Sequence, residues 1–274
     1  MEDLLANPAV QSGVAPFFIA LVIGFLFNRV NILAGLCIIA GFGITVLLSV
    51  GFNFEPLTST RKIILLVLLA PCLAIVLQML KPPIETVLLI SYALISCAII
   101  WIFWPVLKRD FWGEIIPVIS YMIYASWMMA TFIRMTEIPA LTASTAATLT
   151  GIAVGGAALI GSSALLGQMG MSLAAAGGAF LLVQLMVRSE LDAGYTVTLT
   201  SGVIAALVLP AAVVYAKVPW IILVMVSAIP FACFYPFEDE DDVWKNTISL
   251  VLFCGLFIGA ALYVTWQSAG PLLL

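Results

Sequence analysis

The sequence predicts an all-α polytopic bundle that spans a lipid bilayer about ten times, within a range of eight to ten. Three observations carry this prediction. Of the 274 residues, 64% are hydrophobic, only 9% are charged, and apolar stretches long enough to cross a membrane recur along the whole chain. A soluble globular protein carries about 25% charged residues. Because each backbone amide in hydrocarbon needs an internal partner, every span is expected to be a helix.

The spans follow one another through short polar connections. They are predicted at residues 12–28, 32–52, 63–80, 84–107, 115–136, 139–165, 169–187, 194–216, 219–236 and 243–267. At 1.5 Å per residue, residues 63–80 reach about 27 Å, which is just enough to cross. Re-entrant short segments would lower the count to eight or nine. Six tryptophans lie near span ends, as in an interfacial belt, whereas Trp127 is mid-span and is expected to pack between helices.

Composition also excludes several function classes. No polar stretch exceeds about a dozen residues, so the chain is predicted to be one integral membrane domain, residues 1–274, without a soluble catalytic unit. Ten scattered basic residues form no nucleic-acid patch. The chain has no histidine, and its five cysteines lie inside apolar runs. We therefore expect no cofactor and no metal site. The acids of "FEDEDDVWK" (237–245) match no EF-hand spacing, which favours a solvated turn over a Ca²⁺ or Mg²⁺ site.

The expected location is a bacterial cytoplasmic (inner) membrane, where the bilayer itself is the main partner. Ten spans place five basic residues on each side, so positive charge does not decide the orientation. Adjacent basic pairs in two short connections, residues 61–62 and 108–109, favour cytoplasmic termini.

A shift of 136 residues aligns parts of the chain with each other. It places "KPPIETVLLISYALISC" (81–97) on "KVPWIILVMVSAIPFAC" (217–233) and carries spans 2, 3 and 4 onto spans 7, 8 and 9. The alternative is a chance self-match of an apolar chain. If the repeat is real, the halves are residues 1–137 and 138–274. Since five is odd, the second half enters from the opposite side, as in secondary transporters with a site at the repeat interface.

Polar residues cluster before spans 3 and 8, in "GFNFEPLTSTRK" (51–62) and "ELDAGYTVTLTS" (190–201). One interpretation is ordinary helix capping. The other is a polar vestibule that meets a solute or an anionic headgroup. The candidate substrate-binding residues are Glu55, Thr58, Ser59, Thr60, Arg61, Thr198, Thr200 and Ser201.

Two prolines, Pro71 in span 3 and Pro210 in span 8, complete this candidate site. Each removes a helical hydrogen bond, which produces either a simple kink or a broken-helix binding site. Two ion pairs are also predicted if the helices continue far enough, Arg134 with Glu137 and Arg188 with Asp192. Snorkelling of these side chains to the interface is the alternative.

The segment 149–182 is dense in glycine, alanine and serine, including a G-x-x-x-G step at Gly151 and Gly155. Small residues let membrane helices approach closely. The segment is expected to form the packed centre of the bundle, with a pore lining or a face for a homodimer or a membrane-complex partner as the alternative.

These observations favour a transporter or permease-like protein for a small solute or ion. The alternatives are a non-catalytic subunit or scaffold of a membrane complex, and a membrane enzyme acting on a lipid or polyprenyl phosphate. An enzyme is the least favoured, because only 55–62 and 108–114 bring acids and bases together. The layout of ten short spans in fewer than 300 residues is similar to that of drug/metabolite-type transporters, a similarity that no sequence motif accompanies.

Overall fold

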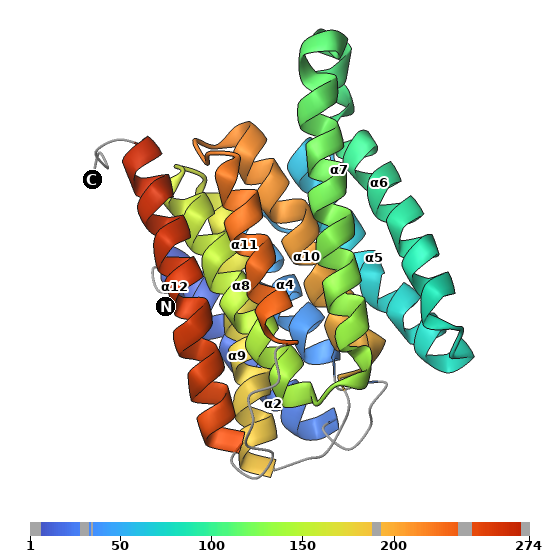
Figure 1. Cartoon of the computed structure of the whole chain (residues 1–274), viewed down its shortest axis with the longest axis vertical. Coiled ribbons are helices and arrows are strands. Elements are labelled where there is room, and N and C mark those ends of the chain that lie inside the picture. Colours follow the sequence, from blue (N-terminus) through green and yellow to red (C-terminus); the bar gives the residue numbers. More distant parts are fainter. Residues whose placement is uncertain (1–6, 28–32, 34, 188–192, 235–242, 270–274) are drawn as a thin grey trace.

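A computed structural model describes residues 7–27, 33, 35–187, 193–234 and 243–269. It confirms the all-α prediction, because the described residues form helices and no strand (Figure 1). The α-helices are α2 (Ala15–Phe27), α4 (Leu36–Ser49), α5 (Ser59–Leu80), α6 (Ile84–Arg109), α7 (Phe111–Arg134), α8 (Ala140–Ile160), α9 (Ala164–Val187), α10 (Gly194–Tyr215), α11 (Ile221–Ala232) and α12 (Val243–Ala269). A π-helical turn, η1 (Val10–Val14), leads into α2, and a 3₁₀ turn, η2 (Met135–Glu137), follows α7.

Eight helical segments of the described chain are long and apolar enough to cross a bilayer. The two shorter ones are α4 with 14 residues and α11 with 12. At 1.5 Å per residue these reach only about 21 and 18 Å, less than the roughly 30 Å hydrocarbon core. The observed count therefore falls within the predicted eight to ten, and the chain is a multi-pass membrane bundle.

Helix α10 forms the centre of the bundle. Nearly all of its side chains are buried, and it packs against α5, α7, α8 and α9. A membrane helix that is surrounded by protein on every side needs small or apolar residues throughout. The alanine, valine and leucine content of "GVIAALVLPAAVV" (202–214) meets this need.

The closest helix contact joins α8 and α9 through small residues. A Cβ atom added to Gly151 would lie 2.4 Å from the backbone nitrogen of Ala174, and one added to Gly155 would lie 2.5 Å from that of Met171. Since neither position has room for a side chain, the two backbones touch directly. Residues 149–182 are therefore tightly packed, as predicted, although α10 and not this segment is the most buried helix, and these glycines face another helix of the same chain.

The polar residues at the start of α5 connect that helix to α6 and α10. The Lys62 ammonium donates a 2.8 Å hydrogen bond to the Trp101 carbonyl of α6. Pro105 lacks the N–H that would normally bond this carbonyl, so Lys62 satisfies an acceptor that the proline leaves free. Ser59 donates to the Ile102 carbonyl at 2.9 Å, and the Tyr215 hydroxyl of α10 donates to Ser59 at 2.9 Å.

Helices α6 and α7 form a hairpin that opens away from its turn. Asp110 accepts a hydrogen bond from the Gly113 amide and thereby caps α7. From this turn the two helices diverge, and α6 descends beside α5 while α7 stays on the main bundle (Figure 1). Tyr124 of α7 donates to the Ala205 carbonyl of α10 at 3.3 Å, which holds α7 in place. The divergence separates the first half of α6 from the second half of α7.

Candidate functional site

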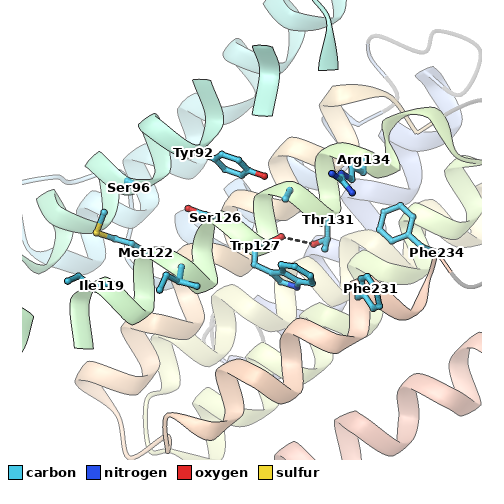
Figure 2. Close-up of a pocket in the computed structure, with 12 residues that line it drawn as sticks. Tyr92, Ser96, Ile119, Met122, Ser126, Trp127, Thr131, Arg134, Phe231 and Phe234 are labelled. Atoms are coloured by element: carbon cyan, nitrogen blue, oxygen red, sulfur yellow. Dashed lines mark hydrogen bonds between the residues drawn. The ribbon is translucent and has the colours of Figure 1, made fainter. Parts of the chain in front are cut away.

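The larger cavity lies where α6 and α7 have separated and is closed on a third side by α11. Its volume is about 770 Å³. Figure 2 shows side chains from the three helices around this space. The lining residues are Tyr92, Ser96, Ile119, Met122, Ile123, Ser126, Trp127, Ala130, Thr131, Arg134, Phe231 and Phe234.

Aromatic and aliphatic side chains make up most of the wall. Trp127 joins α7 to α11, because its indole N–H donates to the Ser227 carbonyl at 3.3 Å and its ring centroid lies 5.8 Å from that of Phe231. The Trp127 side chain is 46% exposed, so the expectation that it packs between helices is only partly met. Ile123 is 66% exposed. The wall therefore opens sideways, toward the hydrocarbon that surrounds a membrane protein.

Polar groups concentrate toward the end of the cavity where α7 terminates. Arg134 is the last residue of α7 and the one charged side chain among the described lining residues. Thr131, one turn earlier, donates to the carbonyls of Trp127 and Met128, so its hydrogen is used within its own helix. The hydroxyls of Tyr92 and Ser126 lie nearer the middle of the cavity, and that of Ser96 lies at the other end, beside Met122 (Figure 2).

The charge of Arg134 has no acidic partner among the described residues. Glu137 lies past the helix end in η2, and no salt bridge joins it to Arg134. The second predicted ion pair, Arg188 with Asp192, lies outside the described residues, as does the acidic run 238–242. Within the part of the chain that the structure describes, Arg134 is thus an exposed and unpaired charge at one end of a mostly apolar cavity.

A second cavity of about 200 Å³ lies between α5, α6 and α10. Its lining is apolar apart from Ser91, and it consists of Leu66, Leu69, Ala70, Leu73, Ser91, Leu94, Ile95, Ala98, Met129, Leu199, Val203 and Leu207. Ser91 is 3% exposed, and its hydroxyl has no hydrogen-bond partner. Since residues 91–98 of α6 contribute to both cavities, the two spaces lie along the same stretch of this helix.

The candidate residues before α5 take local structural roles. Thr58 is the N-cap of α5, and its side chain accepts from the Arg61 amide at 3.4 Å. The Arg61 guanidinium donates to the Pro56 carbonyl at 2.7 Å. Glu55 is exposed, and Thr60 lies in the first turn of α5. Hydrogen bonding at this end therefore follows the capping interpretation.

The candidate residues of α10 lie at the opposite end of the bundle. Gln78, near the end of α5, accepts from the Thr196 amide at 3.4 Å, whereas Tyr215, at the end of α10, bonds Ser59 at the start of α5. The two helices are therefore antiparallel, and the two predicted polar clusters are not brought together.

All three candidate hydroxyl residues of α10 are fully buried. Thr198 donates to the Gly194 carbonyl at 3.0 Å and lies 3.2 Å from the Thr136 hydroxyl. The hydroxyls of Thr200 and Ser201 have no partner. Neither residue lines the two cavities described above.

Both candidate prolines are buried inside continuous helices. Pro71 lies within α5 beside Ala70, which lines the smaller cavity, and Pro210 lies within α10. Helical structure continues on both sides of each proline, which is the pattern of a kink.

Sequence reasoning named Arg134 but not the hydroxyls and aromatic residues around it. A usable signal exists in α7, where Ser126, Ala130 and Arg134 are spaced by four and share one helical face. The contributions of α6 and α11 carry no such signal, because they depend on how far the hairpin opens. No group of three histidine, cysteine or acidic residues that could hold a metal occurs among the described residues.

Comparison of the chain with protein-family models, curated proteins and solved structures finds no significant match, so the geometry of the helices is the basis for a functional assignment.

Proposed function

We propose that this protein is a permease-like carrier for a small solute, with its pathway between α6 on one side and α7, α10 and α11 on the other. The observation that carries the proposal is the 770 Å³ cavity, which is bounded by α6 and α7 from the first predicted half and by α11 from the second. Carriers place their sites at such a boundary. The smaller cavity touches α5 and α10, the third and eighth helices of the chain.

The antiparallel contact of α5 and α10 supports the same proposal. An inverted pair of five-helix halves requires the third and eighth helices to run in opposite directions. We propose residues 1–137 and 138–274 as these halves. We also propose a bacterial cytoplasmic membrane as the location, because outer membranes hold mainly β-barrels. Pro71 and Pro210 would permit small changes of helix direction as one half moves against the other.

Cysteine accessibility tests the pathway without knowledge of the solute. In a chain whose five native cysteines are replaced by alanine, Ser126→Cys and Ser91→Cys report on the larger and the smaller cavity. A charged, membrane-impermeant thiol reagent is added to vesicles of both orientations. We expect Ser126→Cys to react from at least one side, and Ser91→Cys to react more slowly as the carrier changes conformation.

The matched control is Ser172→Cys in α9, a fully buried position outside both cavities. It is expected to remain unreactive. If Ser91→Cys and Ser126→Cys are as inert as Ser172→Cys from both sides, the bundle is sealed and the carrier proposal is wrong.

One observation favours the second candidate, a subunit of a membrane complex. Gly255 and Gly259 form a G-x-x-x-G step on the exposed side of α12, and a Cβ atom at either position would meet nothing within 4 Å. Such steps are typical of helix–helix association in membranes. A homodimer or complex formed there would be disrupted by Gly255→Leu and not by Gly13→Leu, whose added Cβ is also unobstructed. Native mass spectrometry in detergent distinguishes the outcomes.

A further inference from the structure

The lining of the larger cavity changes in polarity along α7. Ile119 and Met122 lie at one end, and Thr131 and Arg134 lie at the other, together with the rings of Phe231 and Phe234 (Figure 2). From residue 119 to residue 134 the helix rises roughly 22 Å, and from 126 to 134 roughly 12 Å. Hydrogen-bonding groups therefore occur along roughly the last 12 Å of this helix, among the apolar side chains of Trp127 and Ala130, whereas the first part is lined by hydrocarbon alone.

These dimensions match a molecule with a polar head and an apolar tail. The hydrocarbon core of a bilayer is about 30 Å thick and two chains deep, so one lipid chain covers about 15 Å. A ligand with its head beside Arg134 and its chain toward Ile119 would occupy the cavity lengthwise. The partly exposed side chains of Ile123, Trp127 and Phe231 leave the cavity open sideways, so a chain can enter directly from the bilayer.

Charge determines which head is accepted. Among the described residues, the Arg134 guanidinium has no acidic partner and no acid lines the cavity. Guanidinium binds phosphate and carboxylate through paired, charge-assisted hydrogen bonds. The aromatic rings of Phe231 and Phe234 lie at the same end of the cavity, and Arg134 itself is exposed (Figure 2).

Three further hydroxyls face the same space without a protein partner. Tyr92 and Ser96 come from α6 and Ser126 from α7. No hydrogen bond joins any of the three to another described residue. Hydroxyl groups both donate and accept, so they suit the ester, glycerol or hydroxyl oxygens that join a charged head to its chains.

We propose that the cavity between α6, α7 and α11 binds an anionic amphiphile, with its phosphate or carboxylate on Arg134 and its hydrocarbon chain along Ile119, Ile123 and Trp127. This assignment rests on the proposed carrier function and names its class of substrate. The same chemistry is offered by an acidic phospholipid of the bilayer and by a fatty acid arriving from water.

Photolabelling of the full chain in phosphatidylcholine nanodiscs tests the assignment. Three probes carry the same diazirine-bearing chain, namely phosphatidylglycerol, phosphatidylcholine and free palmitate. We expect an anionic probe to label residues 119–127 of α7 and the region of Phe231 about tenfold more than phosphatidylcholine does, as one charge-assisted contact predicts. Labelling by phosphatidylglycerol places the source in the bilayer, whereas labelling by palmitate alone places it in water.

Two pairs of variants separate binding from misfolding. Arg134→Gln is expected to abolish the preference for anionic probes, while Arg109→Gln, at the end of α6 outside the cavity, retains it. Ser126→Trp obstructs the middle of the cavity and is expected to reduce labelling, while Ser120→Trp on the exposed side of α7 does not. Arg134→Lys keeps the charge and is expected to retain part of the preference.

Equal labelling by phosphatidylcholine and phosphatidylglycerol that Arg134→Gln leaves unchanged would overturn the assignment, because the cavity would then hold bulk lipid. The same refutation requires that palmitate, too, labels the cavity no more than phosphatidylcholine does. The carrier function fails in a different way, through inert cysteines at Ser91 and Ser126, so the two failures are distinguishable. Selective labelling together with inert cysteines would indicate a bound structural lipid and would overturn the substrate assignment.

Discussion

The hydrogen bond from Lys62 to the Trp101 carbonyl predicts an unusual dependence of stability on a buried lysine. Lys62 is 9% exposed, its ammonium lies 2.8 Å from the carbonyl oxygen, and it also lies 5.0 Å from the Trp101 ring centroid. Replacement by methionine keeps an unbranched side chain only one atom shorter and removes both interactions. The carbonyl is then left without a donor, because Pro105 cannot provide one.

The expected change in the free energy of unfolding combines two lost interactions with one relieved cost. A hydrogen bond from a charged donor contributes about 1.5–3 kcal/mol, and a cation–π contact about 0.5–1 kcal/mol. The offset is the cost of burying the ammonium, which Lys62→Met relieves. We expect the free energy of unfolding to fall by about 1–3 kcal/mol. Reversible unfolding in mixed micelles of increasing SDS content, followed by far-ultraviolet circular dichroism, measures this change.

A double-mutant cycle with Pro105→Ala tests the reason for the loss. Alanine restores a backbone N–H at position 105, so the Trp101 carbonyl regains a helical partner. Lys62→Met should then cost less than it does beside proline, by about 1 kcal/mol. An equal cost in both backgrounds would refute the claim that Lys62 serves the carbonyl freed by the proline.

Two further predictions concern helix packing, and both are checked by the same unfolding assay. Gly155→Ala is expected to destabilise the bundle by about 1–3 kcal/mol, because its Cβ would lie 2.5 Å from the Met171 backbone nitrogen, whereas Gly43→Ala, with nothing within 4 Å, should leave stability almost unchanged. Similar effects of the two glycine changes would contradict the close α8–α9 contact. Tyr215→Phe removes the hydrogen bond to Ser59 and is expected to cost about 0.5–1.5 kcal/mol, and a loss of the same size in a Ser59→Ala background would argue against that bond.

Agreement between sequence and structure is closest where the signal is local. Hydropathy placed a predicted span on each of the ten α-helices of the described chain. The capping interpretation of residues 51–62 agrees with Thr58 as the N-cap of α5, although that span was predicted to begin at residue 63 and the helix begins at Ser59. Contacts between distant segments had no such signal. Helices α5 and α10 are antiparallel, so the hydroxyls of Thr200 and Ser201 and those before α5 lie at opposite ends of the pair. Spacing within a segment carries no information about which other segment faces it.

The sequence by itself determined that the protein lies in a lipid bilayer, that it is all-helical, and in which order the spans follow. The reason is that the free energy of transferring each side chain into hydrocarbon depends on that side chain alone. Tertiary structure decided where space remains between the helices. The cavity beside Arg134 exists because α6 diverges from α7 after the Asp110 turn while α7 stays on α10 through Tyr124. Those contacts join residues far apart in the chain, and no local pattern encodes the angle between two helices that share one turn.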